Sequence, residues 1–468
     1  MRRKLFALED MAEEVSLNPA ELEDEADEAL DDVEDDSGEV EELSTAIEEA
    51  YDEIDNLEDI HDTMEESVEN GEGLDETSAE IADIAVESIC NRLGMKYRNV
   101  IPATESFSSP TSRVTATKIA MEGIKDTISK AWGGIKNAFS KLWERTKAFY
   151  AKLSQNCSKL EAYLQSLESE VDAIDDSRAG QAISFEAGVK GKVSSAISKS
   201  QVKGLGVEGK VDASSVSIIF QNTKALLAAA KEVGAESASF SEFITKEHQN
   251  DRDAYQNVLK KGKAYTDFIN RTFSKIKKVK SAKVNARGEA GEVVNYGPFF
   301  GSKVLSITES EKTREEDEDS QGYSLKTVSL GFDIDPSHKI ESISSATTLK
   351  KNDAKKILAG AIEIVKEVAE YKAIESSVNK GVSKIQSYKE IVFHENITGA
   401  KSGVSEDEKL LPHFFHLMNK EIKQLNNVLS VITVPVAGLS FSTAKAAGNY
   451  IKWSIAHNTA QSSKEIEA

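Results

Sequence analysis

Cysteine and proline are both scarce in this chain. Among its 468 residues there are two cysteines, Cys90 and Cys157, and seven prolines. Two cysteines so far apart in the sequence cannot form the disulfide framework of a small secreted protein, so a reducing compartment is expected. Because proline interrupts helices, its scarcity leaves long stretches free to be helical. The composition therefore argues against a disulfide-stapled fold and favours a helix-rich one.

Long apolar runs are scarce as well. The first ten residues, MRRKLFALED, contain no apolar run of the length that a secretory signal requires. The longest apolar run, Val428–Leu439, is too short to cross a bilayer and has Pro435 in its middle. We therefore expect no membrane span.

Sequence motifs for catalysis are missing or incomplete. The chain has no GxSxG, P-loop or HExxH motif and no cysteine–histidine spacing typical of zinc sites. Residues 204–209 (GLGVEG) match a dinucleotide pattern, but a Ser/Lys-rich stretch precedes them where a strand is required. His413 and His416 lack a third metal ligand, and Asp333 and Asp335 are typical of a turn before proline. We expect no enzyme activity, no cofactor and no metal site.

Charge is what the chain has in abundance, and its two signs are unevenly distributed. The whole chain carries 57 Lys/Arg and 80 Asp/Glu, a net charge of −23. Residues 1–105 hold 6 of the basic residues and 36 of the acidic ones, a net charge of −30. The remaining 363 residues therefore hold 51 and 44, a net charge of +7. The change of sign falls in a loop rich in proline and serine, Asn99–Pro110.

Residues 1–105, the acidic segment, are predicted to be partly disordered and to contain two amphipathic helices. Dense like charge over residues 20–42 favours disorder or a weak helix. From Val40 to Val68 apolar residues recur at intervals of three and four, a seam of about four heptads. A second helix is expected from Thr77 to a stop at Gly94. Its apolar stripe consists of Ile81, Ile84, Ala85, Ile89 and Leu93.

Residues 106–175 are predicted to form a long, basic, amphipathic helix. Residues 106–160 hold ten Lys/Arg against three acidic residues, which accounts for the whole basic excess after Glu105. Gly133–Gly134 is expected to interrupt the helix. Apolar residues then keep a spacing of four and three from Phe139 to Ile174, roughly 54 Å of helix. A seam of this length requires a partner helix, in this chain or in another copy.

The remaining regions complete a mainly α fold. Residues 176–285 are predicted to be a helical region with a Gly/Ser-rich lead-in. Residues 286–340 are predicted to be a small β-hairpin or sheet insert, and residues 341–468 a C-terminal helical region. We expect an elongated helical-bundle or coiled-coil-like body behind the acidic segment.

Basic residues of two stretches are the candidates for contact with phosphate. One stretch is the long helix, and the other is an acid-free run between Ser274 and Arg287. The candidates are Arg113, Lys118, Lys125, Lys130, Lys136, Lys141, Arg145, Lys147, Lys275, Lys277, Lys278 and Lys280. Accumulated Lys/Arg bind nucleic acid without sequence specificity by releasing counterions. For a lone charge run, a solvated helix face is the simpler interpretation.

The loop at the change of sign contains the sequence ATES. Pro102 favours an extended backbone before it, and the loop is polar. Exposed polar loops are preferred sites of proteolysis. Ala103, Thr104, Glu105 and Ser106 are therefore expected to be accessible to a protease.

The acidic segment and this loop resemble the propeptides of the internal head (inner body) proteins of phiKZ-like giant tailed phages. In that family the prohead protease removes an acidic propeptide after a glutamate that has a small residue two positions before it. The resemblance implies a cut after Glu105, with Ser106 as the new N-terminus. The same pattern at Ala120–Glu122, before Gly123, is a second candidate cut, although it lies in a predicted helix that a protease must first unfold.

The resemblance also implies a function. The uncut chain would enter the prohead in the host cytoplasm, with the acidic propeptide acting in assembly, and the basic body would remain inside the capsid with the genome. The implied partners are the prohead protease, other capsid or scaffold proteins and, without sequence specificity, packaged DNA. The helical seams also favour association with other copies of the chain.

Two other classes of protein fit the charge pattern. The first is a cellular, non-viral helical protein in which the acidic segment masks a basic binding surface and is never cut. The second is a membrane-surface protein that uses the basic helix with Trp132 and Trp143. Recovery of the full-length chain would favour the first, and binding of the basic helix to anionic liposomes the second.

Overall fold

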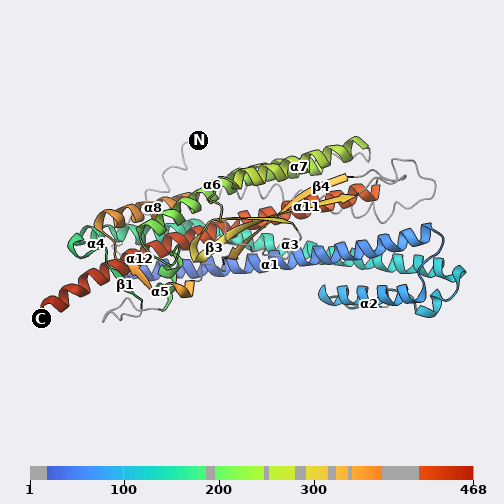
Figure 1. The fold of residues 1–468 in the computed structure, drawn as a ribbon, viewed down its shortest axis with the longest axis horizontal. Helices are drawn as coiled ribbons and strands as arrows, with labels where there is room; N and C mark the ends of the chain where they lie inside the picture. Colours follow the sequence, from blue (N-terminus) through green and yellow to red (C-terminus); the bar gives the residue numbers. More distant parts are fainter. Residues whose placement is uncertain are drawn as a thin grey trace, which may run out of the picture.

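Two very long helices set the shape of the molecule. The computed structural model describes residues 18–98, 100–185, 196–246, 252–279, 291–314, 323–335, 340–371 and 411–466. Within these residues α1 (Pro19–Glu69) and α3 (Pro110–Ser166) run side by side along the long axis of an elongated protein (Figure 1). At 1.5 Å per residue they are about 77 and 86 Å long. The mainly α, elongated fold predicted from the sequence is confirmed.

Helix α1 begins at a strong cap and continues through the acidic region. Asn18 and Glu21 form a capping box, and Pro19 stands in the first turn, where its missing N–H has no partner to lose. The expectation of disorder or a weak helix over residues 20–42 is corrected, because these residues continue α1. The like charges are tolerated because Leu30 and similar apolar residues are buried and the carboxylates meet basic residues of other helices.

The predicted seam of α1 is confirmed. Its residues from Val40 to Met64 are all buried or half-buried. The buried members are Val40, Ile47, Ile54, Leu57, His61 and Met64. They pack along α3, which is the partner helix that so long a seam requires.

Helix α2 (Glu76–Arg92) packs against α1 and the start of the body at one end of the molecule (Figure 1). Its buried face consists of Ala79, Val86, Ile89 and Cys90. Ile81 and Ile84, predicted in the buried stripe, are 63% and 61% exposed. This part of the prediction is corrected: a helix of five turns has more than one apolar row, and here the row through Val86 meets α1 and α3.

Helix α3 is longer than its apolar seam suggested. It begins at a capping box made by Ser109 and Ser112, with Pro110 in the first turn. Gly133–Gly134, expected to interrupt it, lies inside the continuous helix. The packing of Tyr51 of α1 edge-on against Trp132 holds this part of α3 in place, with the ring centroids 5.3 Å apart. The seam from Phe139 to Ile174 is buried or half-buried as predicted, but the single helix predicted over residues 106–175 is corrected. α3 ends at Ser166, and the last seam residues lie in or beside the short α4 (Glu168–Asp172).

The two C-terminal helices form the centre of the molecule. They are α11 (Leu411–Ile432) and α12 (Val434–Ile466), and they run between α1 and the green and orange helices of Figure 1. Both lie in the C-terminal helical region predicted for residues 341–468, and Pro435 stands in the first turn of α12 and helps to start it. Residues Leu417–Asn458 are long and apolar enough to span a membrane, yet 89% of their most apolar window is buried inside the protein. They are the core of the described fold.

Shorter elements cover the core. α6 (Ala213–Lys246), α7 (Arg252–Phe273) and α8 (Lys351–Glu370) pack on α11 or α12. α5 (Ala196–Gly204) is a helix where the sequence suggested only a Gly/Ser-rich loop, because Val202 is buried in the core cluster.

The predicted β insert is a three-stranded antiparallel sheet. Its order is β2 (Glu292–Tyr296), β3 (Lys303–Arg314) and β4 (Tyr323–Ile334). The free edge of β4 is covered by α11, since Gln424 Oε1 and Asn427 Oδ1 accept hydrogen bonds from the N–H groups of Val328 and Leu330. A second, two-stranded sheet pairs β1 (Ala182–Ser184) with β5 (Ser345–Thr347) and was not foreseen.

Candidate processing site and nucleic-acid interface

The predicted cleavage sequence lies on a short exposed turn between α2 and α3. Thr104–Phe107 is a single 3₁₀ turn in which the Ser106 N–H donates to the Ala103 carbonyl at 2.8 Å. Ala103, Thr104, Glu105 and Ser106 are all exposed. The expected exposed loop is therefore found, although its backbone is turned rather than extended.

The turn is anchored on both sides. Ile101 before it is 4% exposed, and Phe107 after it is fully buried in the cluster that joins α1, α2 and α3. Arg113 Nε donates to the Phe107 carbonyl at 2.8 Å, so this candidate phosphate-binding residue has a local structural contact. A protease must release part of these anchors to draw the turn into an active site.

The second candidate cut is placed very differently. Ala120 and Glu122 lie within α3, with Ala120 fully buried and Glu122 exposed. A Cβ atom on Gly123 would lie 2.5 Å from the carbonyl oxygen of Val100, so the loop backbone crosses the helix at this point. Cutting here requires both unwinding of α3 and displacement of the loop.

Three of the basic residues of α3 are paired with the acidic helix. Arg145 Nη1 lies 3.0 Å from Glu39 Oε2, and Lys159 Nζ lies 3.0 Å from Glu28 Oε2. Between them, Lys152 pairs with Asp36 at 3.5 Å. Because residue numbers rise on α1 as they fall on α3, the two helices are antiparallel, and the acidic face of one lies on the basic face of the other.

The other basic residues do not form one surface. Lys118, Lys130 and Lys141 of α3 are exposed and make no ion pair with any other residue in the described ranges. Lys147 lies over the ring of Trp143, 5.5 Å from its centroid. Lys125 and Lys136 also lie on α3, half-buried and exposed respectively.

The second basic run follows α7 rather than α3. Lys275 pairs with Glu232 of α6 at 2.7 Å, while Lys277 and Lys278 are exposed. Lys280 lies outside the described residues. The two basic stretches therefore stand on separate elements.

A further row of lysines, on α11 and α12, was missed by the sequence analysis. Lys420 pairs with Asp55, Lys423 with Asp52 and Lys452 with Glu23. Lys445 Nζ lies 2.7 Å from Asp27 Oδ1. The signal was present in the spacing, because the interval from Glu23 to Asp52 on α1 equals that from Lys423 to Lys452 on the C-terminal helices. The equal intervals predict these ion pairs only when the register between the helices is known, and the sequence alone does not give that register.

Lys445 is the most unusual of these residues. Its side chain is fully buried, and its Nζ lies 4.0 Å from the centroid of the Tyr163 ring of α3. Burial lowers the pKa of the Lys445 ammonium, while the carboxylates of Asp27 and Glu23 oppose that shift. Both carboxylates belong to α1, so the acidic segment supplies the negative charge that this buried lysine needs.

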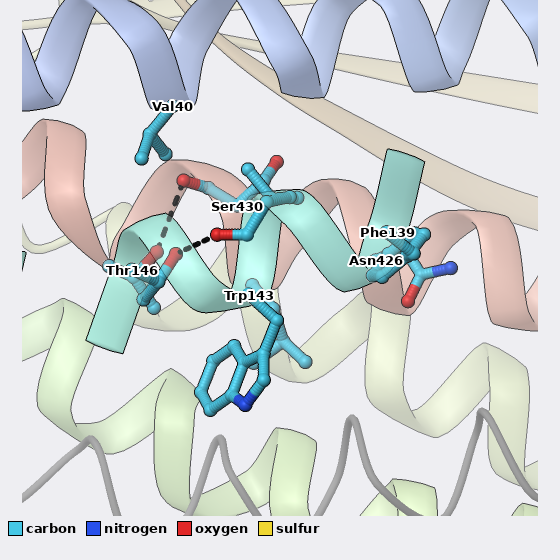
Figure 2. Close-up of a pocket in the computed structure, with 9 residues that line it drawn as sticks. Val40, Phe139, Trp143, Thr146, Asn426 and Ser430 are labelled. Carbon is cyan, nitrogen blue, oxygen red and sulfur yellow. Dashed lines mark hydrogen bonds between the residues drawn. The ribbon is translucent and has the colours of Figure 1, made fainter. Parts of the chain in front are cut away.

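A small cavity marks the place where α1, α3 and α11 meet (Figure 2). Val40, Trp143, Thr146 and Ser430 are among its lining residues. Its volume of about 20 Å³ has room for about one water molecule, and none for a nucleotide or a cofactor. It is a packing gap between three helices.

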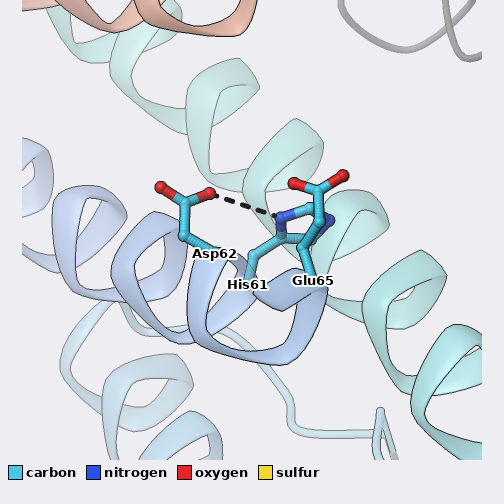
Figure 3. Close-up of side chains that lie close together, drawn as sticks. All are labelled: His61, Asp62 and Glu65. Carbon is cyan, nitrogen blue, oxygen red and sulfur yellow. Dashed lines mark ion pairs between the residues drawn. The ribbon is translucent and has the colours of Figure 1, made fainter. Parts of the chain in front are cut away.

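His61, Asp62 and Glu65 are the one group of possible metal ligands in the described part of the chain (Figure 3). His61 Nδ1 lies 3.6 Å from Asp62 Oδ1, and both carboxylates are exposed. The histidine belongs to the buried seam of α1. One buried ring beside two exposed carboxylates on a single helix is not an ion-binding cage.

The other motifs have structural places. Residues 204–209 form a tight turn between α5 and α6, with Glu208 at φ 53° and Gly209 at φ 79°, so a helix rather than a strand precedes them. Asp333 accepts a hydrogen bond from Ser306 Oγ at 2.6 Å inside the sheet. The side chains of His413 and His416 lie outside the described residues.

These features define an elongated helical structural protein in which an acidic N-terminal helix is docked on a basic body and followed by an exposed turn. The sequence matches the phiKZ-like phage internal head proteins over residues 18–452, so the chain belongs to that family. The match gives the chain a structural role inside the phage capsid, among capsid-related partners. No curated protein and no solved structure gives a significant match.

Proposed function

We propose that this internal head protein is made as a precursor and is cut by the phage prohead protease between Glu105 and Ser106. The observation that carries the proposal is the exposure of all four residues from Ala103 to Ser106 on a turn that separates the acidic segment from α3. A cut here interrupts no long helix and requires only local opening. It divides the chain at the boundary between its two net charges.

The alternative cut after Glu122 is less favourable on physical grounds. The buried Ala120 would have to enter the protease as the small residue of its recognition pattern. Unwinding the first turns of α3 also exposes Ile124, which is fully buried. We therefore assign the processing to Glu105 alone.

In this proposal the acidic segment acts during assembly, when the precursor enters the prohead in the host cytoplasm with capsid and scaffold proteins. Residues 106–468, the body, then stay in the capsid beside the packaged genome. The exposed Lys118, Lys130 and Lys141 support non-specific contact with DNA phosphates. A net charge of +7 is modest for a condensing protein, so filling and structuring the head is the larger part of the role.

The non-viral interpretation of the charge pattern is wrong, because the chain belongs to a phage family. Masking of basic residues by the acidic segment is nevertheless compatible with the proposed function. Arg145, Lys152 and Lys159 are paired with α1 in the uncut chain, which supports suppression of phosphate binding before maturation. The membrane-surface interpretation loses its support, because Trp132 packs on Tyr51 and Trp143 lines the cavity beside α11. These tryptophans face other helices.

Co-expression with the prohead protease tests the proposal. The unaltered chain should yield a fragment whose first residue is Ser106, and Glu105→Gln should remain uncut because the recognised carboxylate is gone. Glu122→Gln is the matched control and should be cut like the unaltered chain. A fragment that begins at Gly123, lost in Glu122→Gln, would overturn the assignment.

A further inference from the structure

The acidic helix α1 lies in a trough of the body. One bank of the trough is α3 between Ala131 and Leu164, and the other is α11 with α12 between Met418 and Trp453. Apolar residues of α1 belong to the same core cluster as both banks. These residues are Ala26, Ala29, Leu30, Val33, Val40, Ile47, Tyr51 and Ile54. The first helix of the chain is therefore part of the main core and not an appendage.

Single residues of α1 touch both banks. Tyr51 packs edge-on against Trp132 of α3, and its hydroxyl accepts a hydrogen bond from Asn426 Nδ2 of α11 at 3.0 Å. A Cβ atom on Gly438 of α12 would lie 3.0 Å from Ser37 Oγ, so the glycine permits close approach of the two helices. The fit of α1 to the trough is thus specific at Ser37 and at Tyr51.

Basic residues line the trough on both sides. Arg145, Lys152 and Lys159 pair with α1 from the α3 bank. The other bank contributes Lys420, Lys423, Lys445 and Lys452. A trough with an apolar floor and basic residues on both sides is complementary to an acidic amphipathic helix. Helix α1, which lies in it, is such a helix.

None of these contacts involves the turn that carries the proposed cut. A break between Glu105 and Ser106 removes the covalent connection and the hydrogen bonds of the turn itself. The trough contacts are untouched because they lie along α1, and a separate cluster holds α2 against Phe107 and Ile124. The backbone N–H of Leu74 also donates to Thr117 Oγ1 of α3 at 2.9 Å. Loss of α1 would leave the buried Lys445 without the two carboxylates that compensate it.

We propose that the trough retains the acidic segment as a non-covalent partner after the chain is cut, so that cleavage and release are separate steps. In the phage the cut itself would come from the cleavage after Glu105, so the proposal rests on the proposed function. Retention of the acidic segment is argued from the packing of α1. Until a second event displaces the segment, the paired basic residues of both banks stay covered in the cut protein.

The test uses the full chain with a recognition site for a sequence-specific protease inserted after Glu105. The protein is cut to completion under native conditions and passed over a size-exclusion column in about 0.15 M salt. Intact masses identify the fragments in each peak. We expect the acidic fragment and the body in one peak, and elution of the two in separate peaks would overturn the proposal.

Charge variants show whether the trough is the binding site. Reversal of its α3 bank, Arg145→Glu with Lys152→Glu and Lys159→Glu, should weaken retention by roughly tenfold or more in dissociation constant. The matched control is Lys118→Glu with Lys130→Glu and Lys141→Glu, which changes the net charge equally on the same helix at exposed residues that make no ion pair with α1 in the described structure. Equal weakening in both would overturn the assignment to the trough. If the triple variant does not fold before cutting, Lys152→Glu against Lys141→Glu gives the same comparison.

The inserted site supplies the cut, so the result does not depend on the prohead protease. Absence of natural cleavage after Glu105 would overturn the proposed function and leave retention to be judged by the column. Separation of the fragments would overturn retention and leave the proposed cut untouched.

Discussion

Lys445 Nζ of the last helix lies 2.7 Å from Asp27 Oδ1 of the first, 418 positions earlier in the chain. The lysine is fully buried, whereas the carboxylate is about half exposed. A buried ammonium is costly without a partner, so this contact couples the body to the acidic segment in both packing and charge. It makes the N-terminal helix a structural element of the full-length protein.

Asp27→Asn should therefore destabilise the full-length protein. Removal of one partner of a buried pair typically costs about 3–5 kcal/mol, and partial exposure of Asp27 reduces this to about 2 kcal/mol here. Urea unfolding followed by circular dichroism measures the loss. Asp24→Asn, an exposed neighbour on the same helix, is the control and should change the unfolding free energy by less than about 0.5 kcal/mol. In a Lys445→Met background the Asp27 effect should vanish, and its persistence would contradict the coupling.

Stability should fall as the pH rises through the neutral range, because of Glu421. Both carboxylate oxygens of this α11 residue are buried without a hydrogen-bond partner among the described residues, against Gly262 of α7. Burial raises the pKa of the Glu421 carboxyl to about 8, well above the roughly 4.3 of an unfolded chain. Between these two pKa values the Glu421 carboxyl is protonated in the folded state and ionised in the unfolded state. The stabilisation by the protonated carboxyl is therefore complete below about pH 4 and is lost as the pH rises through about 8.

Unfolding free energies at intervals between pH 5 and pH 9 test this dependence. Glu421→Gln should flatten the decline, because the amide does not titrate. Glu66→Gln, at an exposed position of α1, should leave the slope unchanged. An identical slope in Glu421→Gln and the unaltered protein would contradict a neutral buried carboxyl at this position.

Phe107 should control how fast the turn is cut. Its fully buried ring anchors the segment directly after the proposed cleavage position. Phe107→Ala leaves a cavity that destabilises the packing of this segment by about 3–5 kcal/mol. The free energy needed to open the turn locally falls as a result. Limited digestion with a glutamate-specific endoprotease should cut the variant after Glu105 faster than the unaltered chain. Ile119→Ala, which removes a 57% exposed side chain from α3, should not change the rate.

The exposed and the paired basic residues of α3 should differ in their effect on DNA binding. In the uncut protein, Lys118→Gln with Lys130→Gln and Lys141→Gln should reduce the salt slope of non-specific DNA binding by roughly 2 to 3. Arg145→Gln with Lys152→Gln and Lys159→Gln should have little effect, because α1 already neutralises these residues. Fluorescence anisotropy over a salt series measures both. Equal effects of the two triple variants would contradict the masking by α1.

Periodicity in the sequence was enough to predict the second half of α1, most of α3 and the seams of both. The buried residues of α1 and α3 follow the spacing of threes and fours, since a helix that buries one face must repeat apolar residues at that interval. The small antiparallel sheet was predicted from its alternating runs for the same reason. The position of the processing turn followed from Pro102 and from the change of net charge.

The partners of those faces were not predictable from the sequence. Charge density suggested disorder over residues 20–42, but ion pairs from α3 and α12 compensate part of that charge, and such pairs depend on tertiary register. Ile84 lies outside while Val86 lies inside for a similar reason, because packing against α1 and α3 selects one of two apolar rows of α2. The strand β5 consists of three residues whose pairing with β1 depends on contacts far along the chain.

The most direct test of the account is the N-terminal sequence and intact mass of this protein in mature phage particles. We predict a chain that begins at Ser106, which would establish processing at the exposed turn. A full-length chain that begins at Met1 would contradict maturation, and a chain that begins at Gly123 would contradict the choice of Glu105.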